Sequence, residues 1–215
     1  MNWMKKVAVA LVCLLPLGLQ AAKVDTLQVK SPSMNKSIEV VVVSPDMAAT
    51  EACPVIYLLH GYGGNARTWV GIKPDLPKIA DEKGIFFVCP DGKNTWYWDS
   101  PLNADVRYET FISDELVKYV DSHYKTVADR KGRAITGLSM GGHGAMWNGL
   151  RHSDVFSAAG STSGGVDIRP FPKNWEMSVQ IGEKAKYPEN WEKYTVINLV
   201  PTLRKDQIAL IFDCG

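Results

Sequence analysis

Histidine and cysteine are scarce in this chain, and neither is spaced as a metal site requires. The 215 residues include four histidines and four cysteines, and no cluster of them has the spacing of a zinc site. Charge of one sign is not in excess either, because 24 lysines and arginines stand against 23 aspartates and glutamates. A balanced surface does not attract nucleic acid or an anionic membrane. We therefore expect one globular domain without a metal, a cofactor or a nucleic-acid partner.

Long apolar runs are missing except at the N-terminus. The first 22 residues carry two early lysines, an apolar stretch from Val7 to Leu19 and small residues at the end. This layout is typical of a secretory signal peptide, and the apolar stretch is short for a membrane span. We predict a cleaved signal peptide over residues 1–22, a secreted or periplasmic protein, and no membrane contact after cleavage. An uncleaved anchor is the alternative.

Cleavage of that peptide would leave three cysteines, Cys53, Cys89 and Cys214, and an odd number argues against a disulfide-stapled scaffold. Cys53 precedes one short apolar run and Cys89 ends the next. In neighbouring parallel strands these positions lie at opposite ends of the sheet. A disulfide needs Cα atoms within about 7 Å of each other, so we expect this pair to stay unbridged.

Short apolar runs alternate with helical patterns along the rest of the chain. The expected strands span residues 26–31, 37–45, 54–61, 84–92, 133–139, 156–164 and 207–213, the expected helices span residues 74–83, 108–124 and 141–153, and residues 166–205 are expected to be irregular. Strands that alternate with helices predict an α/β fold, in which a mostly parallel central sheet has helices on both faces. In such sheets ligands bind at the carboxyl ends of the strands.

Glycines surround one serine at the junction of an expected strand and an expected helix. The stretch Gly137-Leu138-Ser139-Met140-Gly141 fits the pattern G-x-S-x-G. In a nucleophile elbow the serine adopts a strained backbone where strand and helix approach closely, so neighbouring side chains must be absent. The helix that follows directs free N–H groups and its positive dipole end at a developing oxyanion. The motif predicts Ser139 as a catalytic nucleophile, and a glycine-rich packing turn is the alternative.

A second glycine-rich loop, residues 58–65, follows an earlier expected strand. In this architecture such a loop supplies a further donor to the oxyanion hole. The backbone N–H of Tyr62 is the candidate, paired with the N–H of Met140. His60 lies in the same loop, upstream of the serine, and we interpret it as a residue that shapes the loop rather than as a general base.

Aromatic residues are concentrated after another expected strand. Trp96, Tyr97 and Trp98 follow the run at residues 84–92, where their rings are able to flank an acyl group or a sugar ring. Plain loop packing explains these residues equally well. The sequence therefore leaves two interpretations of Trp96 and Trp98 open, substrate binding and packing.

Five segments in this order resemble the secreted esterase family of the α/β-hydrolase superfamily: YLLHGYGG, PDGKNTWYWDSP, YETFISDELVKYVDSHY, AITGLSMGGHGAM and FSAAGSTSGG. That family includes feruloyl and acetyl xylan esterases, tributyrin esterases, S-formylglutathione hydrolase and mycolyltransferases of the antigen 85 group. The resemblance implies an α/β-hydrolase fold and a serine hydrolase of carboxylic esters. It implies Ser139 as the nucleophile, Tyr62 and Met140 as oxyanion donors, and a variable cap that begins at residues 171–175 and shapes substrate choice.

A serine nucleophile needs a histidine to accept its proton and an acid to orient that histidine. In this fold the acid and then the histidine follow the serine along the chain. The histidines after Ser139 are His143 and His152, and both are expected to be ordinary residues of the serine's own helix. Asp213 ends the last expected strand. In the resembling family, however, the triad acid lies a few residues beyond this position and the histidine much later.

We therefore expect residues 23–215 to be an α/β-hydrolase domain truncated before its triad acid and histidine, and inactive as it stands. The whole protein is expected to hydrolyse acylated carbohydrate or short-chain esters. An acyltransferase of the mycolyl type, which uses a sugar acceptor in place of water, and an inactive carbohydrate-binding remnant are the alternatives. The sequence leaves the acyl group, the alcohol and the oligomeric state open.

Overall fold

The computed structural model describes residues 22–214, and the structural statements below concern these residues. The predicted signal peptide at residues 1–22 lies, except for its last residue, outside the described residues and stays a prediction. None of the described helices is long and apolar enough to cross a membrane.

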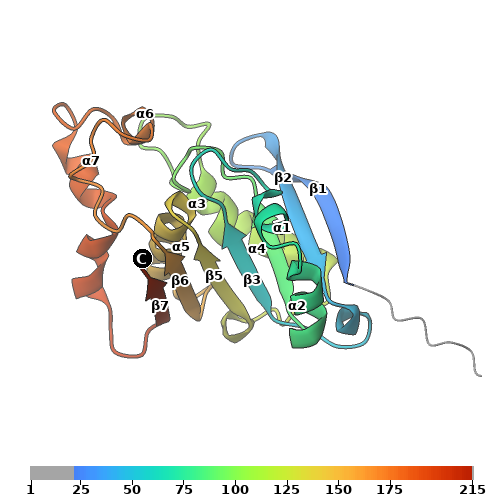
Figure 1. Cartoon of the computed structure of the whole chain (residues 1–215). Coiled ribbons are helices and arrows are strands. Elements are labelled where there is room, and N and C mark those ends of the chain that lie inside the picture. The colour runs from blue at the N-terminus through green and yellow to red at the C-terminus, as the bar shows by residue number, and fades with distance from the viewer. Residues whose placement is uncertain (1–21, 215) are drawn as a thin grey trace, which may run out of the picture.

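Seven strands form one sheet in the order β1-β2-β4-β3-β5-β6-β7 (Figure 1). They are β1 (Lys23–Ser31), β2 (Lys36–Ser44), β3 (Val55–Leu59), β4 (Phe86–Pro90), β5 (Arg133–Gly137), β6 (Ala158–Thr162) and β7 (Ala209–Asp213). β2 pairs antiparallel with β1 and β4, and the other neighbouring strands are parallel. All seven strands match runs expected from the sequence, and the mostly parallel sheet is confirmed. The antiparallel edge arises because a short turn joins β1 to β2 directly.

Helices cover both faces of the sheet (Figure 1). They are α1 (Thr68–Ile72), α2 (Leu76–Lys83), α3 (Tyr108–Thr110), α4 (Leu116–His123), α5 (Met140–Arg151), α6 (Met177–Ile181) and α7 (Pro188–Lys193), with further helical turns η1 (Asp46–Ala49), η2 (Phe111–Glu115), η3 (Arg130–Gly132) and η4 (Val196–Thr202). α2 packs on one face through a small apolar cluster that includes Leu76 and Ala80. α4 and α5 belong to the main core, to which they contribute Val120 and Trp147. This burial on both sides explains the uninterrupted apolar sequences of β3 and β4.

The helices differ from the sequence expectation in three places. The helix expected over residues 108–124 contains a turn of π-helix, η2, between α3 and α4. The Ser113 hydroxyl there donates to the carbonyl of Glu109 at 2.7 Å, and such a bond competes with the regular helical ladder. α1 was not expected, and the segment expected to be irregular contains α6, α7 and η4. These elements are too short for a helical repeat of apolar residues to stand out in the sequence.

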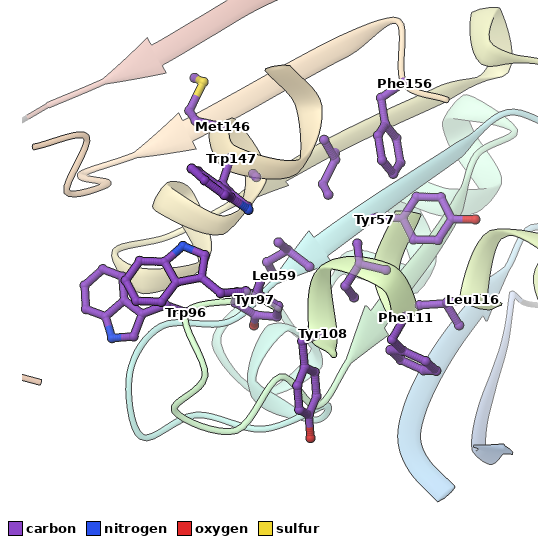
Figure 2. Close-up of a cluster of buried hydrophobic side chains, with 14 of the residues drawn as sticks. Tyr57, Leu59, Trp96, Tyr97, Tyr108, Phe111, Leu116, Met146, Trp147 and Phe156 are labelled. Carbon is purple, nitrogen blue, oxygen red and sulfur yellow. The ribbon is translucent and has the colours of Figure 1, made fainter. Parts of the chain in front are cut away.

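Aromatic side chains of the main core hold the loop after β4 in place (Figure 2). Tyr97 is fully buried, and its hydroxyl donates to the carbonyl of His60 at 3.0 Å. A Cβ on Gly144 of α5 would lie 2.4 Å from the Tyr97 ring, so glycine at this position lets the helix lie against the ring. The loop after β4 is therefore packed between the loop after β3 and the helix that follows Ser139.

The cysteines behave as the sequence predicts. Cys53 precedes β3 and Cys89 lies near the end of β4, a parallel neighbour. Both are buried, and Cys53, Cys89 and Cys214 are all free thiols.

The outer strand β7 is exposed at every residue. Among the described residues no strand pairs with the edge of β7 that faces away from β6. Leu210, Ile211 and Phe212 are 41%, 75% and 75% exposed. An open edge that carries apolar side chains favours association with another strand.

Candidate active site

Ser139 stands at a sharp turn between the end of β5 and the start of α5. Its φ of 52° and ψ of −117° are strained for a residue that carries a side chain. The residue is exposed, at the carboxyl end of the parallel strands. The expected strained backbone at the junction of strand and helix is therefore confirmed, and the structure adds that the serine is exposed.

The glycines beside Ser139 are required by close backbone contacts. A Cβ on Gly137 would lie 2.4 Å from the carbonyl of Gly141. A Cβ on Gly141 would lie 2.2 Å from the carbonyl oxygen of Leu59, at the end of β3. Both clashes are with backbone atoms of packed elements. The strand, the elbow, the helix and β3 thus meet without room for a methyl group.

Backbone hydrogen bonds fix the elbow on both sides. The N–H of Ser139 donates to the carbonyl of Thr162 at 2.9 Å, and the carbonyl of Ser139 accepts from the N–H of His143 at 3.0 Å. Met140 is the first residue of α5, so its N–H has no acceptor within the helix. Within residues 22–214 it donates no hydrogen bond, and it is free to meet an oxyanion.

A tight turn of residues 61–64 lies against the elbow. The N–H of Gly64 closes the turn on the carbonyl of Gly61 at 3.0 Å. A Cβ on Gly61 would lie 2.8 Å from the Leu138 side chain and 3.5 Å from Cβ of Ser139. The loop after β3 is thus packed directly against the serine.

The two central N–H groups of this turn differ. The N–H of Gly63 donates to Oδ1 of Asn94 at 2.9 Å, whereas the N–H of Tyr62 has no acceptor among the described residues. Tyr62, Ser139 and Met140 line the same cavity. This arrangement supports the two expected oxyanion donors, and the convergence of their N–H groups on one point stays a prediction.

The cavity beside Ser139 has a volume of about 300 Å³. Its apolar lining comes from Trp96, Met140, Ile168, Phe171, Trp175 and Met177. Tyr62, Phe171 and Trp175 are 38%, 43% and 46% exposed, and large apolar side chains gathered in this way indicate a binding surface.

The charged side chain that lines the cavity is neutralised by a neighbour. Asp167 lies 2.7 Å from the guanidinium of Arg169, and this hydrogen bond holds the pKa of the Asp167 carboxyl below its usual range. The cavity therefore suits an uncharged, apolar or aromatic group.

The structure separates the two tryptophans that the sequence left open. Trp96 lines the cavity, although it is only 4% exposed. Trp98 is fully buried behind it, with the two ring centroids 5.5 Å apart, and its Nε1 donates to Nε2 of His143 at 2.9 Å. Trp96 thus stands at the cavity, and Trp98 packs beneath it.

His60 is fully buried, and both of its ring nitrogens are occupied. Nε2 accepts from the N–H of Gly92 at 2.9 Å, so Nδ1 carries the proton and donates to the carbonyl of Gly61 at 2.8 Å. These bonds join the loop after β3 to the loop after β4. The interpretation of His60 as a loop-shaping residue is confirmed.

Both ring nitrogens of His143 are also hydrogen-bonded. Its Nε2 accepts from Trp98, and its Nδ1 lies 2.7 Å from the carbonyl of Gly165, to which it donates. Burial lowers the pKa of His143 to about 4, so the ring is neutral at pH 7.

His152 and His123 contact groups other than the serine. Nε2 of His152 lies 2.8 Å from the buried carboxylate of Glu109. Burial alone would raise the pKa of Glu109, but hydrogen bonds from His152 and Arg151 hold it below its usual range. His123 is bonded to the carbonyl of Tyr119 within its own helix. None of the four histidines of the sequence, all within the described residues, is hydrogen-bonded to Ser139.

Asp213 lies at the same end of the sheet as the serine. Its carbonyl accepts from the N–H of Ser163, a residue that lines the cavity, at 2.8 Å. No hydrogen bond joins its carboxylate to a histidine in the part of the chain that the structure describes. Within residues 22–214, no group of three or more His, Cys, Asp or Glu side chains is arranged to hold a metal ion.

Sequence reasoning missed several residues of the site. Ile168 and Met177 line the cavity but occur singly in a segment without apolar periodicity, so no sequence signal marks them. Asn94 lies in a polar turn directly after a strand, and this position was the available signal. Phe171 and Trp175 lie in the expected cap and line the cavity.

Comparison with known proteins places this site in a family. Residues 31–210 match the model of the Esterase family, described as "Putative esterase". An esterase of Mycobacterium tuberculosis (strain CDC 1551 / Oshkosh) is 30% identical over 149 residues, which cover 66% of this chain and 32% of that protein. An acetyl esterase of Caldicellulosiruptor saccharolyticus is 31% identical over 108 residues, which cover 50% of this chain and 40% of that protein. The aligned part thus spans less than half the length of these relatives.

Solved structures agree with the fold. A ferulic acid esterase matches with a TM-score of 0.71 and 28% identity, over 91% of this chain and 79% of its own. An S-formylglutathione hydrolase from Agrobacterium tumefaciens matches with a TM-score of 0.74 and 22% identity, over 91% of this chain and 76% of its own, which supports the fold alone. Because the family match covers most of the sequence and the structure has the corresponding sheet and elbow, this chain belongs to the esterase family of the α/β-hydrolase superfamily.

Proposed function

We propose that this chain carries the nucleophile of a serine esterase that hydrolyses carboxylic esters. The observation that carries the proposal is the conformation of Ser139, whose strained backbone holds an exposed hydroxyl in an apolar cavity. Strain of this kind persists where function requires it, and here the glycines on both sides accommodate it. Membership of the esterase family supports the same reaction.

In this proposal Oγ of Ser139 attacks the carbonyl carbon of the ester and forms a new C–O bond. The carbonyl oxygen becomes an oxyanion, which accepts hydrogen bonds from the N–H groups of Tyr62 and Met140 and lies at the positive end of α5. The oxyanion then collapses, the C–O bond to the alcohol breaks, and the alcohol leaves with the proton that Ser139 gave up. Water attacks the acyl-enzyme, and the acid is released as a proton returns to Oγ of Ser139.

None of the described histidines is hydrogen-bonded to Ser139, and this supports a proton acceptor that lies outside residues 22–214. We propose that a histidine and an orienting acid follow Gly215 in a longer protein, and that residues 23–215 are the nucleophile-bearing part of that domain. The open edge of β7 supports this proposal, since a following strand is able to pair there.

We propose short-chain esters or acylated carbohydrate as substrates. A cavity of about 300 Å³ lies at the lower end of the usual range for ligand sites, which supports a compact acyl group. The ring of Trp96 would contact the bound group, and Trp98 would support that ring from behind. We also propose that residues 1–22 direct export, which mass determination of the mature N-terminus would test.

The test is ester hydrolysis by the protein extended to the natural end of its gene. It is expected to hydrolyse p-nitrophenyl acetate, and its Ser139→Ala variant is expected to be inactive, since loss of a triad costs on the order of a million-fold in a serine protease. The 215-residue chain is expected to be no faster than its own Ser139→Ala variant. Equal rates for the extended protein and its Ser139→Ala variant would refute the esterase. Sugar affinity that survives this substitution, without any turnover, would point to a binding remnant instead.

A further inference from the structure

The turn that carries Tyr62 is held at one of its two central N–H groups. In a four-residue turn the closing hydrogen bond joins the first and last residues, so both central N–H groups remain available. Asn94 accepts from the N–H of Gly63 at 2.9 Å. Gly63 has a φ of 77°, and a Cβ placed on it would have no atom within 4 Å, so packing does not restrain the turn at this residue. Asn94 is therefore the side-chain contact that orients the peptide plane between Tyr62 and Gly63.

Asn94 is itself held from its other side. Its Nδ2 donates to Oε2 of Glu176 at 3.2 Å, and the two bonds together define which way the amide points. Partial burial and the Glu176 carboxylate also raise the pKa of the Tyr62 phenol. A second bond, from Nε1 of Trp96 to the carbonyl of Trp175 at 3.0 Å, joins the same two segments.

Both of the joined segments are strained. Trp96 and Tyr97 are consecutive residues with φ of 58° and 59°, and Trp175 and Glu176 are consecutive residues with φ of 50° and 53°. Residues other than glycine rarely adopt this left-handed backbone conformation. Where they do, the surrounding structure holds them in place, and such residues are concentrated at functional sites. Two strained turns, joined by two hydrogen bonds beside the cavity, form a rigid support for Asn94.

We propose that Asn94 is a positioning residue for the oxyanion hole and that Glu176 is its anchor. This inference rests on the proposed function. Asn94 does not contact the ester; it keeps the turn of residues 61–64 in the orientation in which the N–H of Tyr62 faces the cavity. The N–H of Tyr62 belongs to the adjoining Gly61–Tyr62 peptide, whose carbonyl accepts from Nδ1 of His60 and from the N–H of Gly64. Asn94 fixes the other peptide attached to Tyr62. Without its oxygen the plane between Tyr62 and Gly63 is free to rotate, which shifts Cα of Tyr62 and changes the direction of the donor. A misdirected oxyanion donor weakens binding of the transition state and changes binding of the ground state little, so kcat falls while KM is kept.

The test uses the extended protein and p-nitrophenyl acetate. Asn94→Ala is expected to lower kcat about tenfold or more and to leave KM within about twofold, somewhat less than the ~10²-fold or greater loss for a missing oxyanion donor. Asn94→Asp keeps an acceptor for Gly63 but sets a carboxylate against Glu176, and a reduced kcat is expected. In the double variant Asn94→Asp, Glu176→Gln, the glutamine amide is able to donate to the aspartate carboxylate, so the hydrogen bond is restored with donor and acceptor exchanged. This variant is expected to regain most of the lost kcat. Asn103→Ala is the matched control, because that exposed side chain accepts one backbone N–H, from Asp105 at 2.9 Å, away from the cavity.

The rescue separates positioning from general stability. Melting temperatures show which variants fold, and if Asn94→Ala does not fold, the single and double Asn94→Asp variants decide the question. Two results would overturn the positioning role and leave the proposed function intact, provided that activity depends on Ser139. The first is an unchanged kcat in Asn94→Ala. The second is a double variant whose kcat is no higher than that of Asn94→Asp. If the unmodified protein is no faster than Ser139→Ala, the proposed function fails and this inference fails with it.

Discussion

Gly141 offers the sharpest test of the elbow, because it can be tested on the chain as it stands and without a substrate. It is the second residue of α5, and the helix begins directly against the end of β3. We choose Gly141→Ala, which adds one methyl group and leaves charge and polarity unchanged. The added carbon would lie 2.2 Å from the carbonyl oxygen and 2.5 Å from the carbonyl carbon of Leu59, and 2.6 Å from the carbonyl oxygen of His60.

The magnitude follows from these distances. Cβ atoms do not approach other heavy atoms closer than 3.0 Å, so α5 or the end of β3 has to move by about 0.8 Å. The atoms in the way belong to the backbone of a central strand, and no side-chain rotation relieves the contact. Overpacking of a core costs about 1–3 kcal/mol and sometimes more, and the rigid neighbours here place Gly141→Ala at about 3 kcal/mol. For a domain of this size that corresponds to a melting temperature lower by roughly 6–12 °C.

Gly71→Ala is the matched control. Gly71 lies in α1, and a Cβ there would have no atom within 4 Å. Alanine is the better helix former, so this variant is expected to gain up to about 1 kcal/mol in free energy of unfolding. Urea unfolding followed by tryptophan fluorescence measures both variants against the unmodified chain. Coincident unfolding midpoints for Gly141→Ala and Gly71→Ala would show that the close approach of α5 to β3, on which the elbow depends, is wrong.

Two further predictions concern the same chain. Burial holds the pKa of His143 at about 4 in the folded state, against 6.5 in the unfolded state, so the unfolded state binds a proton first as the pH falls. The contribution of neutral His143 to the free energy of unfolding is therefore complete above about pH 6.5. About 3 kcal/mol of this contribution is lost by pH 4. In urea unfolding at several pH values, His143→Gln should therefore lose less free energy of unfolding between pH 7 and pH 4 than the unmodified chain. An equal loss in both proteins would contradict the lowered pKa of His143. The exposed apolar side chains of β7 are expected to cause association of the 215-residue chain. The double variant Ile211→Lys, Phe212→Lys should therefore scatter less light than the unmodified chain. Unchanged scattering would show that another surface causes the association.

The strands and the elbow were predictable because each depends on a short stretch of sequence. β3 and β4 are apolar throughout, and in a chain of strands and helices such runs belong to a sheet buried on both faces. The glycines at 137 and 141 flank Ser139 because the backbones meet there, and this requirement is visible in the sequence as G-x-S-x-G. The helical turn at Phe111–Glu115 was not predictable in its form, since one local hydrogen bond of a serine hydroxyl accompanies the departure from α-helix.

The walls of the cavity required the tertiary structure. Trp96 and Trp98 are two residues apart and look equivalent in the sequence. In the structure Trp96 lines the cavity, whereas Trp98 is buried and hydrogen-bonded to His143. Consecutive left-handed residues in the loop turn neighbouring side chains in directions that no periodic pattern describes. The lining from Ile168 and Met177 comes from a segment whose place is set by contacts with distant parts of the chain.

By itself the sequence determined the seven strands, the glycine-flanked serine at the strand-to-helix turn and the family to which the chain belongs, because these depend on local patterns of burial and on glycine where backbones touch. The tertiary structure alone decided that His60 and His143 have both ring nitrogens engaged, which aromatic rings meet the cavity, and that Asn94 joins the turn of residues 61–64 to Glu176. The physical reason is that a hydrogen-bond partner distant in sequence leaves no trace in the spacing of residues. Its distance and direction are set only when the sheet brings the loops after β3, β4, β5 and β6 to one edge.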